Sequence, residues 1–174
     1  HGIPGLGYVL EEDERPGRFN RDHAIALGVP PGPLFGRLQR GETVRIVRDG
    51  VETEVRPGDV LGEPRPGRKV VYTGDTRPIQ NLPRVAAMIR DADLLIHDAT
   101  FDDQESSRAR EVLHATAGEA GEAAAALNAR MLALVHISSR YASTANHIRD
   151  AKRQYEGDVI LPADLTVLEI PFRS

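Results

Sequence analysis

The chain has 174 residues, of which 22 are Lys or Arg and 26 are Asp or Glu, giving a net charge of -4 at neutral pH, and it contains no cysteine. The length suits one domain with a hydrophobic core, and the small acidic excess excludes a chain that is basic throughout. The lack of cysteine excludes disulfides, thiolate ligands and cysteine nucleophiles, so a metal would be held by histidine, carboxylate and water. Every apolar run is shorter than the roughly 20 residues of a membrane span, and a cysteine-free chain fits the cytoplasm.

Residues 11–67 are rich in proline, glycine and charge, and these breakers separate short elements. Helices are predicted at 21–27 and 34–38. Strands are predicted at 43–47 and 51–55, and they flank Asp49-Gly50, which strongly favours a hairpin. Because this stretch has little apolar content for its length, we interpret it as a protruding insertion.

From Arg68 onward, strand and helix patterns alternate. Strands are predicted at 69–73, 94–97, 131–136, 159–161 and 166–170, and helices at 82–89, 117–129 and 143–155. Thr116 and Glu119 form a capping-box pattern before the second helix. The alternation predicts an α/β layered domain.

Candidate metal ligands stand just after two apolar, partly β-branched runs. Asp75 follows the run at 70–72, His136 follows the run at 132–135, and His1 is a third candidate. A ligand at the end of a buried strand is held rigidly, and Asp and His suit zinc or manganese. Taken alone, Asp75 is also typical of a turn residue or helix cap, and His136 of a buried or capping histidine. His1 could simply belong to a fraying terminus.

Six ordered motifs point to one family. They are His1 to Tyr8, Gly28 to Gly36, Gly74 to Arg77, His97 to Phe101, His114 to Thr116, and His136 to Tyr141. Together they resemble the C-terminal portion of ribonuclease Z, the tRNA 3′-processing endoribonuclease of the metallo-β-lactamase superfamily. Two positions differ from the family pattern, with Asp98 in place of Glu and Ala115 in place of Ser.

The resemblance implies an αββα sandwich, of which the whole chain, 1–174, would be a partial domain. A flexible tRNA-binding arm would occupy 9–68, and the second half of the sandwich would occupy 69–174. It also implies a zinc-dependent endoribonuclease that removes the 3′ trailer of precursor tRNA, as a cytoplasmic homodimer without membrane association. The family's upstream His-x-His-x-Asp-His cluster is absent from this sequence, so the chain would supply half of a two-zinc site and bind zinc weakly on its own.

The candidate residues can be given roles by physical reasoning. Two-metal hydrolases need a carboxylate that bridges the ions, which suits Asp75, with His136 serving one metal and His1 the other. His114 lies in a predicted loop, and an unperturbed histidine pKa near 6.5 suits an acid that protonates the leaving 3′-oxygen. The resemblance supports the same role. His97 could be structural or touch the substrate.

Arginines are the candidate substrate ligands. Arg140 could contact a phosphate, and Arg37 and Arg40 belong to a set of arginines spread through the insertion, where guanidinium forks suit phosphate oxygens. The alternative for all three is a solvated, mixed-charge surface. His23 and His147, on predicted helices among charged residues, are interpreted as solvated.

Two alternatives to the ribonuclease remain open. One is another hydrolase of the same fold that acts on a different phosphodiester or an ester. The segment Gly28 to Gly36, which resembles the Gly-Pro motif of the family's flexible arm, speaks against it. The other is a catalytically inactive fragment that binds tRNA or a partner, which the missing histidine cluster supports.

Overall fold

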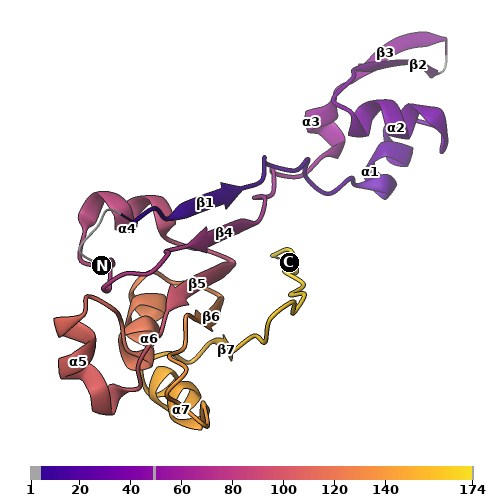
Figure 1. Ribbon diagram of the computed structural model, residues 1–174. Helices are drawn as coiled ribbons and strands as arrows, with labels where there is room; N and C mark the ends of the chain where they lie inside the picture. Colours follow the sequence, from indigo (N-terminus) through magenta and orange to yellow (C-terminus); the bar gives the residue numbers. More distant parts are fainter. Residues whose placement is uncertain (1–4, 49, 174) are drawn as a thin grey trace. The chain divides into compact units, whose positions relative to one another are not determined.

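The computed structural model describes residues 5–173 except residue 49, and Figure 1 shows its helices and strands. The chain divides into two compact units. The first comprises His1–Glu12 and Arg68–Ser174, and the second comprises Asp13–Gly67.

The first unit is built on a five-stranded sheet with the order β1-β4-β5-β6-β7. The strands are β1 (Tyr8–Glu11), β4 (Lys69–Tyr72), β5 (Leu94–Asp98), β6 (Met131–Val135) and β7 (Asp158–Ile160). β1 is antiparallel to β4, whereas β4, β5, β6 and β7 are parallel to their neighbours. The carboxyl ends of β4, β5 and β6 therefore lie along one edge of the sheet.

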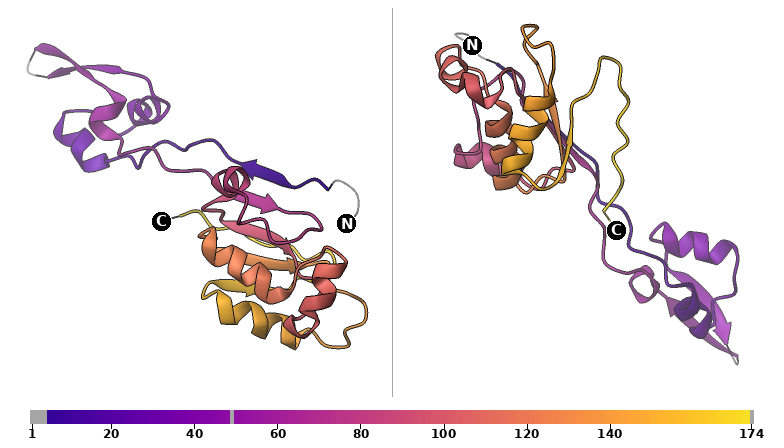
Figure 2. Two further views of the ribbon diagram at one scale, coloured as in Figure 1. Left: turned by 90° about the vertical axis from the view of Figure 1, so that its left-hand side faces the viewer. Right: turned by 90° about the horizontal axis from the view of Figure 1, so that it is seen from below.

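Helices cover one face of this sheet, as Figure 2 shows. They are α4 (Pro83–Ile89), α6 (Ala117–Ala126) and α7 (Ala145–Gln154), and the short η1 (Asp103–Glu105) and α5 (Ser106–Glu111) lie between β5 and α6. The buried core joins Val71, Leu95, Leu132 and Leu134 of the sheet to the alanines of α6. The capping box is present, because Thr116 Oγ1 accepts the amide of Glu119 at 3.2 Å and a Glu119 carboxylate oxygen accepts the amide of Thr116 at 2.9 Å.

The opposite face of the sheet is apolar and partly exposed. Tyr8 and Leu10 of β1 are 62% and 69% exposed, and Tyr72 of β4 is 39% exposed. The described part of the first unit thus has one helical layer and one sheet layer. These are the two layers expected for one half of an αββα sandwich.

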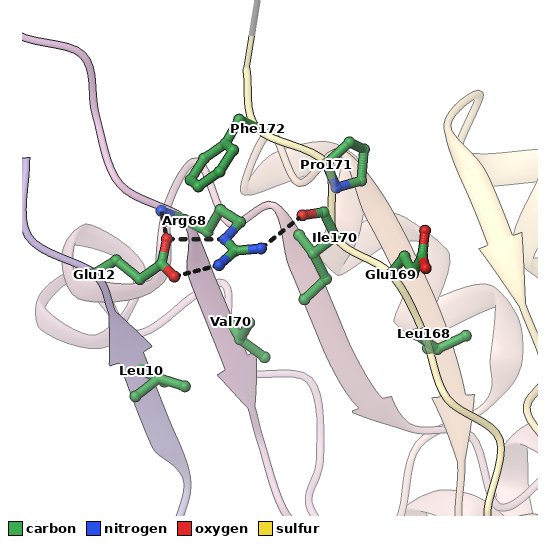
Figure 3. Close-up of a pocket in the computed structure, with 9 residues that line it drawn as sticks. All are labelled: Leu10, Glu12, Arg68, Val70, Leu168, Glu169, Ile170, Pro171 and Phe172. Carbon is green, nitrogen blue, oxygen red and sulfur yellow. Dashed lines mark hydrogen bonds and ion pairs between the residues drawn. The ribbon is translucent and has the colours of Figure 1, made fainter. Parts of the chain in front are cut away.

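The segment after β7 corrects one expectation. No strand forms at 166–170 within the described residues, where the main chain pairs with no neighbouring strand and arginine side chains bind it only at Ile170 and the following Pro171. Arg68 Nη1 donates to Ile170 O at 3.2 Å and Arg130 Nη1 donates to Pro171 O at 2.9 Å. Figure 3 shows Arg68 also paired with Glu12 and lying next to Phe172, whose ring centre is 4.4 Å from the guanidinium carbon.

The second unit has a small core of its own. It contains α1 (Arg21–Ala26), α2 (Pro33–Gln39), the hairpin β2 (Val44–Arg48) and β3 (Val51–Val55), and α3 (Pro57–Val60). The buried apolar residues are Ala24, Val29, Leu38, Val44, Ile46, Val55 and Val60. The insertion was expected to begin at residue 9. The second unit instead begins at Asp13, because Tyr8–Glu11 pair with β4 as an edge strand. In the described part of the chain, the longest helices have 10 residues and are too short to cross a bilayer.

Gly121 lies where α6 closely approaches the backbone of α7. A Cβ added there would lie 2.5 Å from the carbonyl oxygen of Ala151. In an open helix, replacing Gly by Ala stabilises by roughly 1 kcal/mol. Here we predict that Gly121→Ala lowers the free energy of unfolding by about 1–3 kcal/mol because the two helices must separate. Urea denaturation measures this change.

Gly58 provides the control, because it lies in α3 with no atom within 4 Å of an added Cβ. Gly58→Ala should leave the free energy of unfolding unchanged or raise it by up to about 1 kcal/mol, because an open helical position favours Ala over Gly. Equal effects of the two substitutions would contradict the close contact at Gly121.

Candidate functional site

The candidate site lies at the edge of the sheet where β4, β5 and β6 end. Ligands bind outside the carboxyl ends of parallel strands in many α/β folds, because the loops there converge. Three loops supply the predicted residues in the first unit: the turn with Asp75 after β4, the loop before α6 with His114, and the loop with His136 after β6.

Asp75 and His136, two of the three candidate metal ligands, lie close to one another. Oδ2 of Asp75 lies 3.3 Å from Nε2 of His136, and the two side chains are 32% and 44% exposed. Gly74 shapes the turn that presents Asp75. Its φ is +67°, and a Cβ there would lie 2.8 Å from the carbonyl oxygen of Leu6, so the turn favours glycine on two grounds.

Thr100 sets the orientation of the His136 ring. Its Oγ1 lies 2.7 Å from Oδ1 of Asp98 and 2.8 Å from Nδ1 of His136. The hydroxyl donates its one proton to the carboxylate, so it accepts a hydrogen bond from Nδ1–H of His136. Nε2 of His136 then directs its lone pair towards Asp75, as in histidine ligands whose other ring nitrogen is hydrogen-bonded.

His136 also has an uncommon backbone conformation. Its φ is +61°, in the left-handed region that costs a non-glycine residue free energy and that recurs at functional sites. This conformation follows directly after β6 and turns the His136 side chain out of the strand register. The strain supports a role for His136 beyond packing.

Asp98 is the buried centre of the site, with no exposed surface. Its Oδ1 accepts from the amide and hydroxyl of Thr100 at 2.8 and 2.7 Å. Its Oδ2 accepts from the amide of Thr76 at 3.0 Å and from Nδ1 of His114 at 2.7 Å. The shorter Asp, which stands where the resembled motif has Glu, therefore still reaches His114.

His114 lies between Asp98 and His136. The residue is 8% exposed, and its ring stacks on that of His136 with centres 5.0 Å apart and planes 10° apart. Because Nδ1 donates to Asp98, Nε2 is the nitrogen that can take part in proton transfer. Asp98 thus fixes both the tautomer and the orientation of His114.

Two groups of donors at this site could hold a metal ion. Ligand atoms of Asp98, His114 and His136 lie within 4.8 Å of one another, but Asp98 already accepts four hydrogen bonds that a metal would displace. Asp75 and His136 fit better. Two ligands about 2.1 Å from a tetrahedral ion lie about 3.4 Å apart, close to the 3.3 Å between these two atoms. His1 lies outside the described residues.

Arg140 is held near the site but is half exposed. Its Nε donates to Oγ of Ser138 at 3.2 Å, and its guanidinium carbon lies 5.1 Å from the centre of the Phe101 ring. Nη1 also lies 3.9 Å from a carboxylate oxygen of Glu105, with 49% of the Arg140 side chain exposed. These contacts leave part of the guanidinium accessible to an anionic ligand.

Two other histidines have clear structural positions. His97 is fully buried, its Nδ1 donates to the carbonyl of Asp98 at 2.8 Å, and burial lowers its pKa, so the structural reading of this residue is favoured. The interpretation of His147 as solvated is wrong. It is fully buried, edge-on to the Tyr141 ring at 4.6 Å, and burial lowers its pKa.

Arg37 and Arg40 lie in the second unit, on and just after α2. Both bind the Glu42 carboxylate, at 2.9 and 3.2 Å, and these hydrogen bonds, that of Arg37 first, lower the pKa of Glu42. The side chains of Arg37 and Arg40 remain 46% and 65% exposed. They form a small exposed cluster with Glu42.

The sequence interpretation missed the roles of Asp98 and Thr100. Both stand in the motif His97 to Phe101, where a polar residue at a strand end followed two residues later by Thr is typical of a turn held by side chains. That pattern identifies local hydrogen bonds between Asp98 and Thr100. It does not identify His114 and His136 as the distant partners.

Comparison with known proteins shows the family to which the chain belongs. Residues 38–137 match the family described as Beta-lactamase superfamily domain, which is more than half of the chain. The chain belongs to the beta-lactamase superfamily and has its α/β fold.

Within that superfamily the chain is similar to ribonucleases Z. It is 53% identical over 173 residues to the ribonuclease Z of Halorubrum lacusprofundi (99% of this chain, 54% of the relative). It is 49% identical over 175 residues to that of Myxococcus xanthus (100% and 55%). The crystal structure of human tRNase Z, short form, matches with 27% identity and a TM-score of 0.49, covering 75% of this chain and 42% of that chain. The chain spans about half the length of the curated relatives it matches.

The hydroxyl of Thr100 should be important for stability as well as for geometry. Thr100→Val would remove one hydrogen bond from the buried Asp98 carboxylate and one from Nδ1 of His136. We predict that it lowers the free energy of unfolding by about 1–3 kcal/mol, measured by urea denaturation. Thr100→Ser keeps the hydroxyl and should retain more than half of that stability. A Ser variant as unstable as the Val variant would show that the methyl group matters instead.

Proposed function

We propose that the protein is a metal-dependent endoribonuclease that removes the 3′ trailer of precursor tRNA by hydrolysing a phosphodiester. The observation that carries the proposal is that the Asp75–His136 pair, 3.3 Å apart, lies beside the Asp98–His114 pair through the stacked rings of His114 and His136. A candidate metal pair next to a candidate proton donor suits phosphodiester hydrolysis. The similarity to ribonucleases Z supports the precursor tRNA as substrate.

The donor set suits zinc, two ions in the intact site, with manganese as the alternative. Asp75 would bridge the ions, His136 would bind one of them, and His1 would bind the other. Bound metal supplies polarisation of the scissile phosphate and a water of lowered pKa. This chain has two of these donors among its described residues, so the isolated chain should bind zinc weakly or in part.

His114 would protonate the leaving 3′-oxygen from Nε2. Asp98 accepts the hydrogen bond from Nδ1 at 2.7 Å and so leaves Nε2 as the nitrogen that faces away from the carboxylate. Arg140, which is half exposed beside Phe101, would bind a phosphate of the substrate. These residues would donate the proton and orient the RNA on one side of the metal pair.

The second unit would bind the tRNA body as an arm. Arg37 and Arg40 are exposed near one another, and guanidinium groups suit phosphate oxygens. Binding of this kind would read the shape and backbone of a structured RNA. The ribonuclease Z resemblance further supports a homodimer, and the absence of cysteine fits a cytoplasmic location.

The first test separates proton transfer from metal binding, and it uses the full-length natural protein. His114→Ala should lower turnover of precursor tRNA by about 10²–10⁴-fold while the metal content stays unchanged. Asp75→Ala should remove both metal and activity, because the bridging carboxylate is lost. Turnover and elemental analysis are measured on the same preparations. Loss of metal in His114→Ala would make His114 a ligand or a structural residue, and full metal content in Asp75→Ala would end the bridging role. A parent protein that leaves precursor tRNA intact would refute the proposed function itself.

The second test concerns the arm. Replacing Arg37 and Arg40 together by Ala should weaken tRNA binding and flatten its dependence on salt by roughly one counterion per lost phosphate contact. Hydrolysis of a small phosphodiester should stay unchanged, because that substrate has no tRNA body for the arm to bind. Filter binding at several salt concentrations and a chromogenic phosphodiester provide the two measurements. An equal loss on both substrates would place these arginines in the fold or the active site.

A further inference from the structure

Arg77 connects the turn that carries Asp75 to the loop that carries His114. Its Nη1 and Nη2 donate to the two carboxylate oxygens of Glu119, the first at 2.8 Å, and Nη1 also donates to the carbonyl oxygen of His114. The side chains of Arg77 and Glu119 are 30% and 18% exposed. The guanidinium therefore makes three partly buried hydrogen bonds, two of them to a single carboxylate in a fork arrangement.

Glu119 is a fixed anchor for this arginine. The carboxylate that binds Arg77 also accepts the amide of Thr116 at 2.9 Å, and the amide of Glu119 donates to Oγ1 of Thr116 at 3.2 Å. This capping box begins α6, whose first turn is buried. Because the capping box fixes the Glu119 carboxylate at the start of α6, the guanidinium of Arg77 is also fixed in position against this helix.

The loop with His114 is supported at three points. The amide of His114 donates to Ala109 O at 2.9 Å, its carbonyl accepts from Arg77, and its Nδ1 donates to Asp98. The preceding Leu113 has a φ of +63°, so the loop makes a strained turn just before His114. Arg77 binds the carbonyl on the far side of that turn, where the chain enters α6.

We propose that Arg77 is a positioning residue for His114. By fixing the carbonyl of His114 against the start of α6, it holds the ring where Nδ1 meets Asp98 and Nε2 meets the substrate. The alternative is an ion pair that stabilises the fold without acting on His114. The bond from Nη1 to the His114 carbonyl favours positioning, because an ion pair with Glu119 does not require it. A lysine could not make all three bonds, since it lacks the planar fork.

Amide hydrogen exchange on the 174-residue chain tests the positioning directly. In Arg77→Gln the amide of His114 should exchange about tenfold faster than in the parent. The amide of Thr116, capped by Glu119, and that of Leu132 in the core of the sheet should keep their rates. Arg108→Gln is the matched control, because Arg108 pairs with Glu111 at 2.7 Å on exposed α5, and it should leave the His114 amide unchanged.

The exchange result has a definite negative. Unchanged exchange at His114 in Arg77→Gln would overturn the proposal. Faster exchange at Thr116 and Leu132 to the same extent as at His114 would make Arg77 a residue of the fold, and it would also overturn the proposal. Arg77→Lys keeps the charge and is used if the Gln variant does not fold, with the same two negatives.

Kinetics on the full-length natural protein add a measurement that a purely structural role would not affect, and this part rests on the proposed function. Arg77→Gln should lower kcat on precursor tRNA by about 10- to 100-fold with KM within about twofold, because a misplaced acid loses rate. In a His114→Ala background, the same substitution should cost no more than about twofold, because both act on one step. Equal losses in the two backgrounds would refute the link to His114. If the parent protein does not cleave precursor tRNA, the proposed function falls, while hydrogen exchange still decides the role of Arg77.

Discussion

The buried carboxylate of Asp98 is the constraint on which the candidate site depends. A buried charge is tolerated only when hydrogen bonds replace its lost hydration, and Asp98 receives them from Thr76, Thr100 and His114. These donors come from the turn after β4, the loop after β5 and the loop before α6. The hydrogen bonds to this one carboxylate therefore hold three loops next to one another. The hydroxyl of Thr100, which also bonds to His136, then sets the position of His136.

The two ends of the parallel strands in the first unit have different kinds of contacts. At the carboxyl ends of the parallel strands, short loops converge on acceptors and imidazoles. At the amino ends, Asp93 collects the amide of Lys69 and the side chains of Arg130 and Arg173. Burial alone raises the pKa of Asp93, but these hydrogen bonds outweigh it and the pKa is lowered. The hydrogen bonds at the amino ends join distant segments of the chain, whereas the loops at the carboxyl ends leave Asp75 and His136 partly exposed.

Local sequence predicted the elements whose causes are local. Asp49-Gly50 marked the hairpin of β2 and β3, and Thr116 with Glu119 marked the start of α6, because turn and cap chemistry acts within a few residues. The segment 166–170 has a strand-like composition but forms no strand, because pairing depends on a neighbour that its own residues do not specify. The prediction that His147 is solvated was wrong for the same reason. Its burial comes from packing on Tyr141, which hydropathy along α7 does not reveal.

The candidate site divides in the same way. Asp75 and His136 were found because a strand followed by a ligand is a pattern within one segment. Their 3.3 Å approach, the bond from Thr76 to Asp98 and the bond from Arg77 to the His114 carbonyl join residues that lie 61, 22 and 37 positions apart. Such contacts depend on the order of strands in the sheet. The alternation of strands and helices in the sequence predicted the α/β fold class but not that order. The family resemblance groups the motifs, whereas the hydrogen bonds between them follow from the fold.

The partly exposed apolar face of the sheet has a consequence for how the chain behaves in solution. Tyr8, Leu10 and Tyr72 place aromatic and aliphatic surface side by side on β1 and β4, with β1 at an open sheet edge. Contiguous apolar surface next to unpaired strand edges promotes self-association. The colloidal properties of the 174-residue chain should therefore be governed by this face rather than by its net charge of -4. Detergent or a covering protein surface would improve its solubility more than a change in ionic strength.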